Sequence, residues 1–436
     1  MANRIITALD VGSTKITAAI ASIEEGQAPK VIGVATYPSE GLKKGTIVDI
    51  DDAINSVAAC LEAAERMAGI TVSSVYVTIN GKDITSTNNR GVVAIAQDEI
   101  VTDDVFRAIE SARTVSIPPA REILHVIPRE FIVDAQSGIK DPVGMTGTRL
   151  EVDAHIISAT STSIHNLIKS VQQLGLKIDD IVFTGWASST AVLTPTEKEL
   201  GVMLLDIGGG TTSINTFVDD SITFSGCIPF GGVNITSDLA IGLRVSLEDA
   251  EKIKVNFSDL VKGRPEVNDA TKRREELLGG KDEDEEKDPK KKKDVIDVTS
   301  LEVEGMKTVS KKLFDEIVEA RLGEIFSLVI NQLEQSRNEY RLPAGVVITG
   351  GAAMLPRITS IAKGVFGAPA RVGNPNGVEG LIDEISTPAY SVAQGLILYG
   401  AVDDGGGKRN VGSHGPKEKS GGILGNITGF LKNLLP

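Results

Sequence analysis

Residues 205–212 read LDIGGGTT, and residues 9–15 near the N-terminus repeat the same design as LDVGSTK. A short apolar run precedes each stretch and a strand-like run follows it, so each is predicted to form the turn of a β-hairpin. Glycine lets such a turn bring its backbone N–H groups close to an anion, and Ser and Thr hydroxyls add donors for phosphate oxygens. The Asp that opens each turn can hold Mg²⁺ through water. Two such hairpins, facing each other, would hold a polyphosphate from both sides.

A third stretch supports this prediction, because a glycine-rich hairpin alone is more often a plain tight turn. Residues 346–356 read VVITGGAAMLP, which predicts a strand, a turn at Gly350 and Gly351, and the start of a helix. A helix start offers free N–H groups and the positive end of the helix dipole to an anion. Neither the dinucleotide-binding glycine fingerprint nor the Walker-type phosphate loop occurs in the sequence.

These three stretches, in this order and at these separations, resemble the nucleotide-binding fold of actin, the sugar kinases and the chaperone ATPases. The resemblance implies an α/β protein of two lobes, each built on a ribonuclease-H-like domain, with ATP and Mg²⁺ between them. Many relatives place Glu or Gln at the start of the first crossing helix to orient the attacking water. The corresponding residues here are Thr184, Gly185 and Trp186. We therefore expect nucleotide binding with at most weak ATPase activity, and assign no catalytic residue.

Composition limits the other possibilities. The chain has 436 residues, which predicts two or more domains, and a formal net charge of −14, which argues against nucleic acid as a partner. Cys60 and Cys227 are the only cysteines and are expected to be reduced, small apolar core residues. The N-terminus shows no signal segment, and no run approaches the ~20 apolar residues that span a bilayer. These features predict a soluble body in the cytoplasm.

A second string narrows the resemblance. Residues 138–150 read GIKDPVGMTGTRL, and this loop is similar to a hallmark of the FtsA family of bacterial cell-division proteins, which insert a small α+β subdomain at this point of the actin-like fold. The implied order of segments is first-lobe core (1–82 and 161–196), inserted subdomain (83–160), second-lobe core (197–231 and 309–387), second-lobe small subdomain (232–308, with a charged loop at 279–294), returning crossing helix (388–402), flexible linker (403–422) and terminal helix (423–435). Within these segments we expect helices over residues 102–115 and 309–337.

The predicted ligand contacts fall into three groups. Phosphate and Mg²⁺ contacts on the first side are assigned to Asp10, Gly12, Ser13, Thr14 and Lys15, and on the second side to Asp206, Gly208, Gly209, Gly210 and Thr211. Glu251 and Lys254 share one face of a predicted helix, where a surface ion pair is the simplest interpretation. The resemblance implies instead that Glu251 and Lys254, with Gly350 and Gly351, hold the adenosine.

The C-terminal segment predicts a membrane anchor. Residues 403–422 are rich in glycine and polar residues, as a flexible linker is. The helix that follows carries one apolar stripe, formed by Ile423, Leu424, Ile427, Phe430, Leu431, Leu434 and Leu435. At 1.5 Å per residue it is too short to span a bilayer and suits the membrane interface, although docking on a protein is the alternative. FtsA proteins end in such a membrane-binding helix. With two glycines and one Lys it is a weak anchor, so attachment needs many copies.

The resemblance also implies a process and partners. It predicts a filament-forming protein that tethers FtsZ filaments to the cytoplasmic face of the membrane at the division site and contacts other division proteins. Arg321 is similar to a family position near the groove for the FtsZ C-terminal peptide, although an ordinary exposed arginine is the alternative. A pilus-assembly scaffold of related architecture and a sugar kinase of the same fold are the competing interpretations. The tethered amphipathic helix argues against both.

Overall fold

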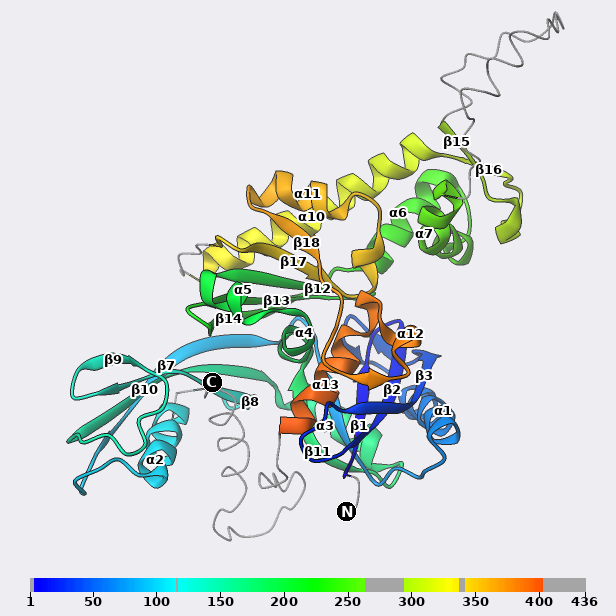
Figure 1. Cartoon of the computed structure of the whole chain (residues 1–436). Coiled ribbons are helices and arrows are strands. Elements are labelled where there is room, and N and C mark those ends of the chain that lie inside the picture. Colours follow the sequence, from blue (N-terminus) through cyan, green and yellow to red (C-terminus); the bar gives the residue numbers. More distant parts are fainter. Residues whose placement is uncertain (1–3, 115–116, 263–293, 337–341, 403–436) are drawn as a thin grey trace, which may run out of the picture.

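The computed structural model describes residues 4–114, 117–262, 294–336 and 342–402. Two lobes face each other, and a smaller subdomain projects from the first lobe and lies beside the sheet of the second (Figure 1). The predicted linker and the predicted terminal helix lie outside the described residues. The predicted charged loop also lies outside them, apart from Asp294. Among the residues that are described, no helix is both long and apolar enough to cross a membrane.

The first lobe is built on a six-stranded sheet. Its strand order is β11 (Lys177–Phe183), β6 (Ser74–Ile79), β1 (Arg4–Val11), β2 (Lys15–Ile23), β3 (Lys30–Pro38) and β19 (Glu379–Gly380). Successive strand residues point to opposite faces, so Leu9 joins one buried cluster and Ala8 another. Helices α1 (Ile50–Ala68) and α3 (Ser161–Gln172) cover the Leu9 face. Helices α4 (Thr184–Val192) and α13 (Ser391–Val402) cover the Ala8 face.

The second lobe repeats this plan with five strands. Their order is β14 (Ser221–Ile228), β13 (Thr212–Val218), β12 (Val202–Ile207), β17 (Gly345–Thr349) and β18 (Ala370–Val372). Helices α10 (Lys311–Gln335) and α11 (Ile358–Phe366) pack on this sheet. Helix α6 (Gly232–Leu243) packs on α10, and α7 (Leu247–Lys262) packs on α6, within the same buried cluster. A short hairpin of β15 (Val295–Asp297) and β16 (Thr308–Ser310) adds Ile296 and Val309 to the same core.

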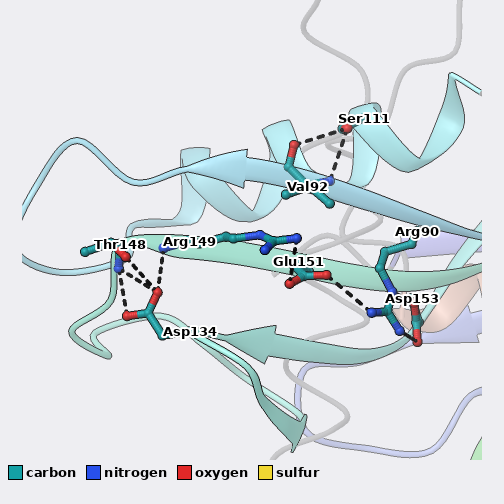
Figure 2. A network of polar contacts seen from close by, with 8 residues as sticks. All are labelled: Arg90, Val92, Ser111, Asp134, Thr148, Arg149, Glu151 and Asp153. Atoms are coloured by element: carbon teal, nitrogen blue, oxygen red, sulfur yellow. Dashed lines mark hydrogen bonds and ion pairs between the residues drawn. The ribbon is translucent and has the colours of Figure 1, made fainter.

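The inserted subdomain is a four-stranded antiparallel sheet covered by one helix. Its order is β7 (Thr85–Ala94), β10 (Arg149–Thr160), β8 (Arg121–Val133) and β9 (Gln136–Ile139), and α2 (Thr102–Arg113) packs on one face. Gly91 permits that packing, because a Cβ there would lie 2.0 Å from the carbonyl oxygen of Ala108. The other face carries cross-strand ion pairs: Figure 2 shows Arg90 reaching Asp153 and Glu151.

The loop that suggested the family is held at its end by one carboxylate. Asp134 accepts hydrogen bonds from the backbone N–H groups of Thr148 and Arg149 and from the hydroxyl of Thr148 (Figure 2). These bonds to Thr148 hold the pKa of Asp134 below its usual value, since they favour the ionised carboxylate. The string GIKDPVGMTGTRL therefore ends in a fixed connection into β10.

Most predicted elements are confirmed, with shifts at their ends. The helix expected over 102–115 ends at Arg113, and the helix expected over 309–337 is Lys311–Gln335. The chain turns at Gly350–Gly351 as expected, but the helix that follows the turn is a 3₁₀ helix (η2, Gly351–Met354). The α-helix α11 spans Ile358–Phe366. The sequence reading also missed a hairpin of β4 (Leu42–Lys43) and β5 (Thr46–Ile47), whose strands are too short to show a periodic pattern.

Both cysteines are buried and unpaired. Cys60 lies in α1 and Cys227 in β14, and burial raises the pKa of Cys60 to about 11 and that of Cys227 to about 12. Both thiols therefore stay protonated at neutral pH and act as small apolar core groups, as the sequence suggested.

The crossing helices α4 and α13 pack against each other at a glycine. A Cβ on Gly395 would lie 1.8 Å from the carbonyl oxygen of Ala187, so the two backbones touch where a side chain would stand. We expect Gly395→Ala to lower the free energy of unfolding by about 3 kcal/mol, because a packed backbone cannot move aside cheaply. Chemical denaturation followed by circular dichroism measures this loss.

The matched control is Gly364→Ala. Gly364 is an exposed glycine of α11, and a Cβ there meets nothing within 4 Å. The same chemical change should stabilise the protein by about 0.5–1 kcal/mol, because alanine loses less entropy than glycine on entering a helix. Equal effects of the two substitutions would contradict the helix contact described above.

Candidate functional site

The two glycine-rich turns have the same geometry in the two lobes. In the first, the N–H of Gly12 donates to the carbonyl of Lys15 at 3.1 Å, and in the second the N–H of Gly208 donates to Thr211 at 2.9 Å. Their strands also share a register, since Asp10 pairs with Thr17 and Asp206 with Ser213. Each Asp therefore occupies the same position relative to its turn. The predicted duplication is structural as well as sequential.

The turns meet directly across the two lobes. A Cβ on Gly209 would lie 2.3 Å from Cγ2 of Thr14, and one on Gly210 would lie 2.8 Å from Cβ of Ser13. The absence of side chains on the second turn thus lets the first turn approach it. A short connection of the first lobe supports this contact, because the N–H of Gly45 donates to Oγ of Ser13 at 2.7 Å.

A cavity of about 380 Å³ lies at this meeting point. Every residue predicted to contact phosphate, Mg²⁺ or adenosine lines it except Gly210, namely Asp10, Gly12, Ser13, Thr14, Lys15, Asp206, Gly208, Gly209, Thr211, Glu251, Lys254, Gly350 and Gly351. Gly210 contacts Ser13 instead, at the seam between the turns. Residues separated by more than three hundred positions are brought to one space.

The two carboxylates at the centre are strongly desolvated. The hydroxyl of Thr78 donates to Oδ1 of Asp10 at 2.9 Å and itself accepts the N–H of Val11. Burial raises the pKa of Asp10, and the bond from Thr78 and the charge of Lys15 offset part of that rise. Burial, and then the neighbouring charge of Asp10, raise the pKa of Asp206 to about 7. Two ionised carboxylates in this space are therefore unfavourable unless further positive charge lies near them.

Gly350 closes the space behind Asp206. Its φ of 85° lies in the left-handed region, and a Cβ there would stand 2.4 Å from Oδ1 of Asp206. Both observations require glycine at this position. The Gly350–Gly351 turn therefore packs its backbone against the second carboxylate, although it does so from a 3₁₀ turn rather than from the start of an α-helix.

Glu251 and Lys254 do form an ion pair, but Lys254 is not on the surface. Its Nζ lies 2.7 Å from Oε2 of Glu251 and donates to Thr236 Oγ1 and to the carbonyl of Gly232, and only 10% of its side chain is exposed. Lys254 thus ties α7 to the start of α6. The carboxylate of Glu251, 47% exposed, is left at the edge of the cavity.

One end of the cavity is apolar. Val233, Val255 and Met354 line it while remaining exposed to solvent by 43%, 65% and 56%. No motif in the sequence had marked these three residues as ligand contacts. Val255 could have been found, because it follows Glu251 by four residues and shares its helix face. Exposed apolar side chains at the mouth of a cavity suit a flat apolar ring with polar groups at its far end.

Lys15 lines the cavity, and its ammonium group lies over an aromatic ring. Its Nζ lies 3.9 Å from the centroid of the Tyr390 ring, a cation–π contact.

Two further polar residues line the cavity. Thr184 begins α4, and its hydroxyl hydrogen-bonds Oγ of Ser213 at 2.9 Å. Asn80, which no sequence motif indicated, also lines the cavity.

Arg321 lies elsewhere, between α10 and α6. It makes a bidentate ion pair with Asp238 of α6 and a further contact with Glu324 at 2.6 Å, and 22% of its side chain is exposed. These bonds raise the pKa of Arg321, so its charge is permanent. It is neither part of the cavity nor an ordinary free surface arginine.

Two lobes with equivalent hairpins around a shared cavity define an actin-like protein. The solved PilM–PilN type IV pilus biogenesis complex has a similar chain, with a TM-score of 0.58 at 15% identity, covering 91% of this chain and 98% of that one. At this identity the likeness shows the fold, and it does not extend to pilus assembly.

Closer relatives give the family. The domain described as "SHS2 domain inserted in FTSA" matches residues 81–158, and "Cell division protein FtsA" matches residues 203–395. The chain is 35% identical to the cell division protein FtsA of Pseudomonas aeruginosa, covering 91% of this chain and 89% of that protein. It is 34% identical to that of Neisseria meningitidis, covering 99% and 98%. The chain belongs to the FtsA family of actin-like cell-division proteins.

The raised pKa of Asp206 predicts that the stability of the folded protein depends on pH. Between pH 3.8, the ordinary pKa of an aspartate, and about pH 7, the folded state binds a proton that the unfolded state has released. Its stabilising contribution is therefore lost as pH rises through 7. In nucleotide-free, Mg²⁺-free protein, Asp206→Asn should raise the melting temperature at pH 8, and this gain should shrink at pH 5.5. A gain that is equal at both pH values would contradict the burial of this charge.

Proposed function

We propose that this chain binds ATP with Mg²⁺ in the cleft between its lobes. One observation carries the proposal: Asp10 and Asp206, at equivalent positions of equivalent turns, face one cavity of about 380 Å³. The turns carry backbone N–H groups and the hydroxyls of Ser13, Thr14 and Thr211, which are phosphate donors. A polyphosphate is the ligand that these groups fit.

The donor set also fits the cation. Two buried carboxylates with raised pKa values are unfavourable as a bare pair, and a hard divalent cation such as Mg²⁺ removes the cost. Asp10 and Asp206 would hold the ion, directly or through water. When bound, Mg²⁺ supplies charge neutralisation for the phosphates. Lys15 would leave the ring of Tyr390 and add a further positive charge.

The adenosine would lie toward the second lobe. Glu251 and Lys254 offer polar groups for the sugar, and the apolar end formed by Val233, Val255 and Met354 offers a surface for the base. The Gly350–Gly351 turn would pass close beneath it. Hydrolysis is expected to be weak, because Thr184 stands at the start of α4 and a hydroxyl is a poor base for activating water.

We further propose that the nucleotide-bound protein forms actin-like filaments that tether FtsZ filaments to the cytoplasmic face of the membrane at the division site. Support comes from the FtsA family and from the apolar stripe of residues 423–435. Each subunit would add one weak membrane contact, and many together bind firmly. The FtsZ C-terminal peptide would bind near Arg321, and other division proteins would bind the assembled filament.

The nucleotide proposal predicts that Gly209→Asp abolishes ATP binding. The new side chain starts 2.3 Å from Thr14 and adds a negative charge where phosphate must approach. Isothermal calorimetry with Mg·ATP should show an affinity loss of at least about a hundredfold, which corresponds to about 3 kcal/mol. Circular dichroism checks that the variant is folded.

Gly364→Asp is the control for the same chemical change. Gly364 is exposed on α11, away from the cavity, so ATP affinity should stay within about twofold. Unchanged affinity in folded Gly209→Asp would refute the assignment of the cleft as the ATP site.

The tether proposal predicts that deletion of residues 423–436 separates two activities. Full-length protein with Mg·ATP should carry a fluorescent FtsZ C-terminal peptide to anionic liposomes in a sedimentation assay. The truncated protein should still bind the peptide in solution, measured by fluorescence anisotropy, but leave it in the supernatant. Continued sedimentation of the truncated protein would place the membrane contact elsewhere, and absence of peptide binding by the full-length protein would remove FtsZ from the proposal.

A further inference from the structure

The inserted subdomain leaves the first lobe at a residue that contacts the nucleotide cleft. Asn80 directly follows β6, and the first strand of the insert, β7, begins at Thr85. The amide Nδ2 of Asn80 donates to Thr211 Oγ1 and to Ser213 Oγ, each at 3.0 Å, and both belong to the second lobe. Its Oδ1 accepts the N–H of Gly81. The entry to the insert is therefore held by bonds that cross between lobes.

The two hydroxyls that Asn80 holds belong to the cleft. Thr211 lines the cavity, and Ser213 bonds to Thr184, which lines it as well. A hydroxyl that accepts from an amide has its own hydrogen free to donate. The bond from Asn80 thus leaves the Thr211 hydroxyl to act as a donor, either to the nearby Cys227 sulfur or to a ligand oxygen. Ligand binding at Thr211 and the bond from Asn80 support each other.

The insert makes a second, larger contact with the same lobe. Oγ of Ser86 accepts the N–H of Ser225 and donates to its carbonyl, and Asn88 donates to the carbonyl of Thr223. These residues join β7 to β14, the edge strand of the second-lobe sheet. Side chains of one edge strand thereby satisfy the free backbone groups of another.

A buried histidine reinforces this contact. His155 of β10 is fully buried, with Nδ1 2.6 Å from Asn88 Oδ1 and Nε2 3.0 Å from Ser225 Oγ. Burial lowers its pKa to about 3, so the ring is neutral and offers one donor and one acceptor. Ser86, Asn88, His155 and Ser225 form one connected polar network, here called the seam, in which His155 and Ser225 are buried and Asn88 is exposed. Loss of Ser225 or Asn88 takes a hydrogen-bond partner from the buried ring of His155.

The cleft and the seam lie on one face of neighbouring strands. Ser213 of β13 pairs with Cys227 of β14, and two residues further Asn215 pairs with Ser225. Ser213 and Asn215 therefore share a face, and that face leads from Asn80 to His155. Between them, the amide atoms of Asn215 are buried without a hydrogen-bond partner in the described part of the chain. If the side chains along this face shift, the amide of Asn215 can form a new hydrogen bond with one of them, which lowers the free-energy cost of the shift.

We propose that Asn80 is a positioning residue through which nucleotide in the cleft sets how firmly the inserted subdomain is held against the second lobe. The inference rests on the proposed nucleotide binding and goes beyond it. Bound nucleotide fixes the positions of Thr211 and Ser213. Asn80 stays hydrogen-bonded to both hydroxyls, and this holds β7 in contact with β14. Without nucleotide the hydrogen bonds of the seam break more often, and the inserted subdomain rotates away from β14 while it stays connected to the first lobe.

Hydrogen–deuterium exchange of the full-length chain tests this coupling. Addition of a non-hydrolysable ATP analogue with Mg²⁺ should slow exchange about fivefold or more in peptides covering residues 85–94 and 221–228, the low end of typical coupling between sites. In Asn80→Ala the analogue should bind about fivefold or more weakly by calorimetry, because coupling between two sites is reciprocal, and at saturating concentration it should still slow exchange over residues 206–212. The slowing over residues 85–94 should be lost. A residue with only a structural role would speed exchange equally with and without the analogue.

The matched control is Asn256→Ala, which removes an amide that bonds to the Lys252 carbonyl on the surface of α7 and should behave as wild type. Asn80→Ser serves if the alanine variant melts too low. Wild-type protein that binds the analogue with no change over residues 85–94 overturns the coupling and leaves nucleotide binding intact. Retained slowing in a folded Asn80 variant also overturns it. Wild-type protein that does not bind the analogue refutes the proposed function itself, and the coupling with it.

Discussion

The direct contact between two glycine-rich turns, one from each lobe, is the constraint on which the structure depends. Thr14 occupies the space where Gly209 lacks a side chain, so the lobes close until their turns touch. That approach buries Asp10 and Asp206 together, and desolvation raises both pKa values. The folded protein therefore carries an electrostatic cost that a bound cation would relieve.

Other contacts make the closed arrangement specific. The helices α4 and α13 touch through Gly395 and Ala187, so the crossing between lobes is packed backbone against backbone. The inserted subdomain adds a link, because it grows from the first lobe and contacts β14 of the second. These contacts hold the two lobes and the inserted subdomain in one arrangement.

Sequence reasoning succeeded where chemistry and chain order coincide. The strands on either side of LDVGSTK and LDIGGGTT follow from local patterns. It failed where tertiary contacts decide. The turn at Gly350 was expected to open an α-helix, but its left-handed backbone packs against Asp206 and a 3₁₀ turn follows. Asn80 carries no motif, because an isolated amide has no periodic or spaced pattern.

By itself the sequence determined the duplicated hairpins, the two-lobed fold class and the family, because turn glycines and strand alternation are properties of neighbouring residues. It also singled out the residues that line the cleft, whose role as an ATP site remains our proposal. Only the tertiary structure decided that Gly210 contacts Ser13 instead of the cavity, that Lys254 donates to Thr236 of α6, and that Asn80 bridges the lobes. These outcomes depend on how closely two separately formed sheets approach, and that distance is set by packing across the whole molecule.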